Sequence, residues 1–263
     1  MKSIKLSYHS VIESEENNCH FWTDGKFVFY ERNNIPLKNA HPEKMRCWRN
    51  FAYDDERVFL RNKPLRGVSP VGFMILNYSF VKTNSHVITE NGYVKVNNDS
   101  VVQTLDNGMW YGSSELSAYG YIKIDNTIWY HAHWNDGLTK LTSVNANHFI
   151  SLQDGVLGMD DKKVYAFGKI VAGASVKDFR KIIDSIYCGY YISNGKLFFE
   201  NKMIREASID MIYIPDEVLK AQRSIRLLVC DNRYYAGEVE VSYEIFEKWL
   251  NNYKEIANKQ QTD

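Results

Sequence analysis

The sequence DDERVFLRNKPLRGVSPVGF, from Asp54 to Phe73, returns in altered form as DDKKVYAFGKIVAGASVKDF, from Asp160 to Phe179. The two stretches align without a gap and share seven residues, where chance gives about one. Self-similarity of this kind is typical of repeat proteins. Weaker copies begin at Asp24, Tyr93, Tyr121, Ser193 and Asp231. We therefore predict about six or seven degenerate β-hairpin repeats between residues 20 and 240.

Each copy contains an apolar strand, a polar turn and a returning strand. Asp and Asn tolerate the backbone of a tight turn, so the Asp pairs at Asp54 and Asp160 mark the hairpin turn. Ser175, and the Ser-Pro and His-Pro pairs of the other copies, predict a short helical turn that carries Phe73, Phe179 or Ile212 back onto the sheet. A lone hairpin is marginally stable in water, so the units must stack. The predicted fold is mainly β, a repetitive β-hairpin array that is propeller-like or solenoid-like.

The end of the chain has a different pattern. In residues 242–259 an apolar face recurs at helical spacing, and it comprises Phe246, Trp249, Leu250, Tyr253 and Ile256. We expect a C-terminal capping helix that covers the last repeat, with a partner-binding helix as the alternative. A second short helix is predicted over Pro215–Arg223. Residues 1–263 are expected to form a single domain.

Composition excludes several function classes. The 32 basic and 32 acidic residues leave no net charge, so the basic excess of a nucleic-acid-binding protein is missing. No apolar run is long enough to cross a membrane, and the first residues lack the apolar segment of a signal peptide. We therefore expect a soluble, cytoplasmic protein with no membrane or nucleic-acid partner.

The four cysteines give a related prediction. Cys19, Cys47, Cys188 and Cys230 are far apart and form no C-x-x-C pair. Four such residues can make two disulfides in a secreted protein. For a chain of this length without an export signal, we predict four buried, reduced thiols.

One repeat resembles a known family. Asp161-Lys162-Lys163-Val164-Tyr165, followed by Gly168-Lys169-Ile170, resembles the repeat of the bacterial DKNYY family. The resemblance implies a repetitive β fold without a known catalytic site. Members of the family are often suspected immunity proteins, encoded beside toxins of contact-dependent or type VI secretion systems.

For each candidate catalytic or metal site, a purely structural role of the residues is the better explanation. His131 and His133 alternate on a predicted strand and would share a metal with His148, but no carboxylate or cysteine completes the ligand set. Cys188 and Cys230 lack the surroundings of a nucleophile. The Asp pairs could bind calcium, yet their recurrence favours turn chemistry. We expect no catalytic residue, no metal and no cofactor.

Aromatic residues give the best candidate for a binding surface, because Trp and Tyr dominate interface hot spots. The predicted partner-binding residues are Trp110, Tyr111, Trp129, His131, His133 and Trp134. The leading hypothesis is an immunity protein, not an enzyme, that neutralises a cognate protein toxin by occluding its active site. The alternatives are a carbohydrate- or peptide-binding module that uses the same aromatic residues, and a hydrolase that uses His131 or His133.

Overall fold

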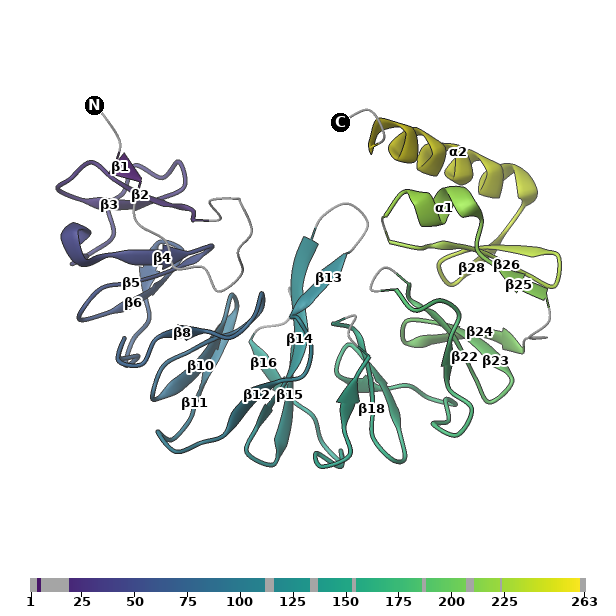
Figure 1. Cartoon of the computed structure of the whole chain (residues 1–263), viewed down its shortest axis with the longest axis horizontal. Helices are drawn as coiled ribbons and strands as arrows, with labels where there is room; N and C mark the ends of the chain where they lie inside the picture. The colour runs from purple at the N-terminus through teal and green to yellow at the C-terminus, as the bar shows by residue number, and fades with distance from the viewer. Residues whose placement is uncertain are drawn as a thin grey trace. The chain divides into compact units, whose positions relative to one another are not determined.

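The computed structural model describes residues 4–5, 19–111, 116–132, 137–152, 155–185, 188–206, 211–222 and 224–260 (Figure 1). The chain divides into two compact units. Unit 1 comprises Met1–Val101 and His133–Leu138, and unit 2 comprises Val102–Ala132 and Thr139–Asp263. No helix in the described ranges has the length and apolar character needed to span a membrane.

Unit 1 contains three antiparallel sheets. The first has the strands β1 (Ile4–Lys5), β2 (Phe21–Thr23) and β3 (Val28–Tyr30). The second has β4 (Arg46–Trp48), β5 (Phe51–Tyr53), β6 (Val58–Leu60) and β7 (Lys63–Pro64), and the third has β8 (Met74–Ile75), β9 (Val81–Lys82), β10 (His86–Thr89) and β11 (Gly92–Lys95). Apolar side chains from consecutive sheets pack together: Phe21 of the first contacts the cluster of Phe59, and Phe51 of the second shares a cluster with Ile88.

Unit 2 continues with four more sheets. Two of them comprise β12 (Val102–Thr104), β13 (Met109–Tyr111), β14 (Leu116–Ile124), β15 (Thr127–Ala132) and β16 (Leu138–Lys140), then β17 (Ile150–Ser151), β18 (Leu157–Met159), β19 (Val164–Ala166) and β20 (Lys169–Ile170). The other two comprise β21 (Arg180–Lys181), β22 (Tyr190–Ser193), β23 (Lys196–Phe199) and β24 (Lys202–Glu206), then β25 (Ile212–Tyr213), β26 (Leu227–Cys230), β27 (Arg233–Ala236) and β28 (Val239–Val241). Helices α1 (Asp216–Lys220) and α2 (Tyr243–Gln260) accompany the last sheet (Figure 1).

The two stretches that align in sequence have the same structure. Strand β5 pairs with β6 in the register Tyr53↔Val58, and β18 pairs with β19 in the register Met159↔Val164. Each hairpin is closed by a turn that begins at the aligned aspartate. The prediction of a mainly β, repetitive array is confirmed.

The aligned aspartates are buried acceptors. Oδ1 of Asp54 accepts hydrogen bonds from the backbone N–H groups of Glu56 (2.8 Å) and Arg57 (2.7 Å) in the turn, and Oδ2 accepts one from His41 N–H (3.1 Å) in the segment before β4. Asp160 repeats the arrangement with Lys162, Lys163 and Asn145 at 2.8, 2.7 and 3.0 Å. One carboxylate thus closes the turn and ties it to the preceding connection, which is the turn chemistry expected from the recurrence.

The helical turn predicted for every unit is wrong for most of them. A 3-10 turn, η1 (Pro42–Lys44), precedes β4, but the segments around Ser69 and Ser175 form turns. At Ser175 the backbone N–H donates to Ser193 Oγ at 2.6 Å, which ties this segment to the following sheet. Gly72, inside the turn predicted after Ser69, has a φ angle of +74°, which is incompatible with a right-handed helix. Phe73 and Phe179 nevertheless return to a sheet, where their rings contact Tyr53 and Tyr191.

Both predicted helices are confirmed. Helix α2 begins after Ser242, whose Oγ accepts a hydrogen bond from Ile245 N–H at 3.4 Å. Phe246 and Tyr253 are buried, as the apolar face predicts, whereas Trp249 is exposed. Tyr253 O–H donates to Ser224 O at 2.6 Å and fixes α2 to the chain just before β26.

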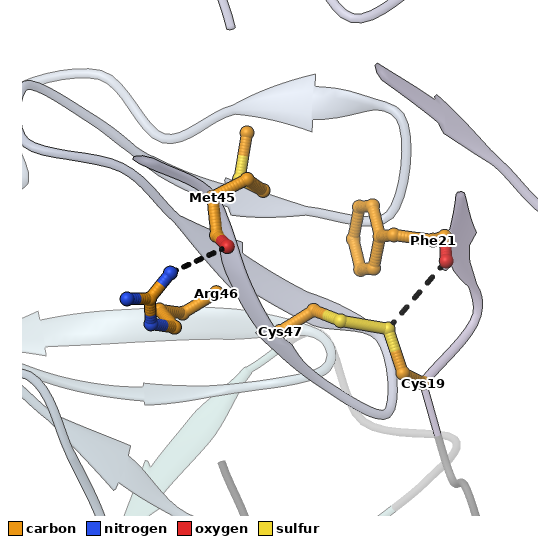
Figure 2. The surroundings of a disulfide bond; sticks show 5 residues. All are labelled: Cys19, Phe21, Met45, Arg46 and Cys47. Carbon is orange, nitrogen blue, oxygen red and sulfur yellow. Dashed lines mark hydrogen bonds between the residues drawn. A yellow bond between two sulfur atoms is a disulfide. The ribbon is translucent and has the colours of Figure 1, made fainter. Parts of the chain in front are cut away.

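The cysteine prediction is wrong for one pair. Cys19, just before β2, forms a disulfide with Cys47 in β4 (Figure 2). Cys188 and Cys230 are buried thiols. The pairing joins the first sheet to the second. Sequence spacing did not indicate it, because the two residues meet only when consecutive sheets stack.

Candidate interaction surface

Of the two predicted binding residues in β13, Trp110 has an internal role. Trp110 is half-buried, with its ring centroid 4.9 Å from that of Tyr119 and 5.9 Å from that of Phe167. It therefore packs between two sheets of unit 2. Tyr111 is the last residue of β13, and its side chain lies outside the described part of the molecule.

Strand β15 is a core strand, contrary to the expectation of an exposed aromatic strand. His131 is fully buried and Trp129 is half-buried, and Ile128, Tyr130 and Ala132 of the same strand belong to an apolar cluster of unit 2. His148 is exposed, whereas His131 is fully buried. His133 and Trp134 fall outside the described residues. The three predicted residues whose side chains are described, Trp110, Trp129 and His131, are half-buried or buried and form no exposed patch.

His41, Asp54 and Asp55 form the cluster whose donor atoms come closest to a metal site in the described chain. Asp55 is already engaged by Lys44 and by His41 Nδ1, at 2.9 Å for the latter. Lys44, and then His41, lower the pKa of Asp55 to about 2, and Asp55 raises the pKa of His41. The aligned pair Asn145 and Asp161 makes the same contact with an amide at 3.1 Å. The cluster is a recurring turn contact.

An open groove lies at the C-terminal end of unit 2, between β25, α1 and the first turns of α2. Its volume is about 500 Å³. The lining includes Tyr213, Pro215, Asp216, Tyr234, Tyr243 and Phe246. The outer rings belong to Tyr213 and Tyr243, which are 57% and 53% exposed. The ring of Tyr234 supports the floor, 5.3 Å from Tyr243 and 5.0 Å from Phe246.

Buried anchors hold the groove in shape. Val218 and Ala221 fix α1 to the apolar core of the last two sheets, and Phe246 fixes α2 to the same core. The short α1 starts directly after the buried Pro215, whose ring suits a helix start. Tyr243 lies at the start of the anchored α2, and Tyr213 lies in β25, which pairs with the buried strand β26. Such anchoring lowers the entropy lost when a partner binds.

The rim of the groove is polar. Asp216 and Glu217 come from the first turn of α1, and Lys220 from its last residue. Lys254 of α2 approaches Glu217 at 3.9 Å. Tyr243 O–H lies 3.5 Å from Glu247, and that carboxylate raises the pKa of the tyrosine. An apolar floor with a charged rim is the usual anatomy of a protein-binding site.

Exposed apolar side chains are frequent in the last sheet and its helices, and two of them, Tyr213 and Tyr243, line the groove. Of the 16 exposed large apolar residues in the described chain, seven lie in the last sheet and its helices: Met211, Tyr213, Leu219, Val239, Tyr243, Ile245 and Trp249. Sequence reasoning missed them because it searched for aromatic clusters along single strands. The usable signal was the excess of apolar residues in α2, since Tyr243, Ile245 and Trp249 do not fit on one buried face.

Comparison with known proteins identifies the family. A search of curated proteins and a search of solved structures gave no match. The model of the DKNYY family matches residues 51–235, more than half of the chain, and includes both aligned hairpins. The chain belongs to the DKNYY family.

Proposed function

We propose that this protein is an immunity protein that binds a cognate bacterial toxin, delivered by a type VI or contact-dependent secretion system, and neutralises it by covering its active site. It acts by binding and catalyses no reaction. The observation that carries the proposal is the groove at the C-terminal end of unit 2, where Tyr213 and Tyr243 are exposed on rigidly anchored elements.

The groove suits a protein partner for two reasons. Exposed tyrosines beside the apolar side chains of Tyr234, Phe246 and Leu250 have the composition of an interface hot spot. Large apolar patches on a protein surface commonly mark partner sites. The family resemblance supplies the kind of partner, since related proteins are suspected to be encoded beside toxins.

Toxicity in a bacterial host tests the proposal. The product of the gene directly upstream is expressed alone and together with this protein. We expect it to be toxic alone, to be neutralised by co-expression and to co-purify with the intact chain. A neighbour that is harmless alone, or that remains toxic and does not co-purify, overturns the proposal.

Variants then locate the contact. The double variant Tyr213→Ala/Tyr243→Ala is expected to lose protection while remaining folded, because both rings are largely exposed. Ile170→Ala removes an equally exposed apolar side chain elsewhere in unit 2 and serves as the matched control. If both variants protect like the wild type, the groove is not the contact.

A carbohydrate or an extended peptide is the second candidate ligand. The exposed faces of Tyr213 and Tyr243 are suited to stacking on a sugar ring or a peptide side chain. Saturable binding on a glycan or peptide array, lost in the Tyr213→Ala/Tyr243→Ala variant, would favour this function over toxin neutralisation.

A further inference from the structure

The Cys19–Cys47 disulfide is the covalent link between the first two sheets (Figure 2). Cys47 is 1% exposed in the core shared by these sheets, whereas Cys19 is partly exposed. The other described backbone ties across this point are a bridge between Cys19 and Arg49 and the bond from His20 N–H to Arg49 O at 3.2 Å. The disulfide therefore reinforces a junction that has little backbone pairing.

The first sheet is the smallest of the described sheets. It has three strands, and the other described sheets have four or five. In repeat proteins each unit is stabilised by its neighbours, so the first sheet depends on its packing against the second. Local opening is therefore expected to start at this sheet unless a crosslink prevents it.

The repeat shows that the position of Cys19 accommodates a thiol as well as a disulfide. Cys188 occupies the equivalent place two residues before β22, and its thiol donates to Tyr190 O at 3.7 Å. Sγ of Cys19 lies 3.6 Å from Phe21 O, although a disulfide sulfur has no hydrogen to donate. Reduction would thus give Cys19 a thiol with an acceptor already in place, and both redox states are compatible with the local backbone.

We propose that Cys19–Cys47 is a redox latch on the first sheet and that the protein works, and meets its partner, in an oxidising compartment. Disulfides persist in such compartments and are rare in a reducing cytoplasm. The part that concerns the partner rests on the proposed function, while the latch does not. On this view the cognate toxin acts in the same compartment, which differs from the cytoplasmic location expected from the sequence.

The chemistry is thiol–disulfide exchange with a disulfide oxidant. Cys19 and Cys47 together lose two electrons and two protons as the S–S bond forms, and the oxidant is reduced to two thiols. In the reverse direction, an external thiolate attacks the partly exposed Cys19 sulfur and releases the Cys47 thiolate. A second thiolate then removes the first from Cys19.

Thiol trapping in the cells that naturally make the protein tests the compartment. Cells are quenched in acid, and their proteins are denatured, alkylated and digested. Mass spectrometry then measures the peptides that contain the four cysteines. We expect Cys19 and Cys47 to be linked and the buried thiols of Cys188 and Cys230 to be alkylated, which provides the internal control. Alkylation of all four residues overturns the proposal, whatever the result with the toxin.

Hydrogen exchange of the purified full chain tests the latch. Amides of β2 and β3 are compared in the oxidised protein, the reduced protein and the Cys19→Ser/Cys47→Ser variant. We expect exchange there to rise by at least about tenfold on reduction, while β26 and β27 in unit 2 stay unchanged. The variant should match the reduced protein. Equal protection of β2 and β3 in all three forms contradicts a latch.

Discussion

Two junctions between consecutive sheets begin at a cysteine in equivalent repeat positions, but they are stabilised differently. Cys19 and Cys188 each lie two residues before a strand and form a parallel bridge with the following sheet, at Arg49 and Ile225 respectively. In unit 1 the junction is closed by the disulfide with Cys47. In unit 2 it is closed by α1, since Val218 and Ala221 share an apolar cluster with Cys188 and Ile225.

The residues around the two junctions also differ in charge and burial. Arg49 pairs with Glu90 at 2.8 Å, and both side chains are about nine-tenths buried, whereas Ile225 lies in an apolar core. Glu31 and Glu200 also correspond, because their N–H groups donate to the carbonyls of His20 and Gly189. Glu31 is exposed, while Glu200 is folded over Gly189 and is partly buried.

The difference shows how one repeat supports two roles. A disulfide and a buried ion pair stabilise the packing of the first sheets and need no additional helix or strand. Two helices fasten the last sheet, and the space between them and β25 becomes the groove. The helices that stabilise the last sheet therefore also produce a candidate binding site.

Removal of Glu90 should have the largest effect on stability. Glu90→Ala leaves Arg49 buried without its carboxylate, which costs about 3–5 kcal/mol. Asn50, whose Nδ2 donates to Glu90 at 2.9 Å, also loses an acceptor. Hydrogen exchange in β4–β6 measures the loss. Adding Arg49→Met should recover part of it, and an unchanged exchange rate in Glu90→Ala would show that the ion pair does not support this junction.

Val218→Ala tests how strongly the packing of α1 stabilises the last junction of unit 2. Val218 is fully buried, so removing two methyl groups should cost about 1.5–3 kcal/mol. Urea unfolding with hydrogen exchange in α1 and β26 provides the measurement. The exposed neighbour Leu219→Ala is the control and should change stability by less than about 0.5 kcal/mol. Equal effects of the two variants would mean that α1 is not anchored through Val218.

Glu200→Gln tests the buried glutamate. Burial raises the pKa of Glu200 to about 7 from 4.5, so the stability linked to its protonation is complete below about pH 4.5 and is lost as the pH rises through 7. The variant should therefore increase the free energy of unfolding at pH 8 by about 1–3 kcal/mol and change it little at pH 4.

Glu31→Gln is the matched control for this change. Its side chain is exposed, so the variant should alter stability by less than about 0.5 kcal/mol at either pH. Denaturant unfolding at pH 4 and pH 8 separates the two outcomes. A pH dependence that is the same in both variants would contradict the difference between the two junctions.

The sequence predicted the local features of the fold well. The Asp54 and Asp160 turns and helix α2 follow from turn chemistry, capping and periodicity, which act over a few residues. The disulfide could not be predicted in this way, although Cys19-His20-Phe21 and Cys188-Gly189-Tyr190 are repeat equivalents. The length of the connection between sheets decides that Cys47 meets Cys19. In the last junction the residue equivalent to Arg49 is Ile225, which follows the inserted helix α1.

The candidate site was the least predictable feature. Trp129 and His131 have the composition of a binding strand, but in the folded array His131 is fully buried and Trp129 is half-buried. Tyr213 and Tyr243 come from segments 30 residues apart and become neighbours in a groove only after α1 and α2 have packed. Their exposure depends on which helix face the core accepts, and that is a property of the tertiary structure.

The most direct test is a hydrogen-exchange footprint of the complex between the intact, oxidised protein and the product of the neighbouring gene. The last sheet with its helices should bind the partner, and the first two sheets should not. Exchange should therefore slow in β25, α1 and the first turns of α2, and remain unchanged in β2 and β3. Slower exchange confined to the first two sheets, with none around Tyr213 and Tyr243, would contradict the assignment of the groove as the partner site.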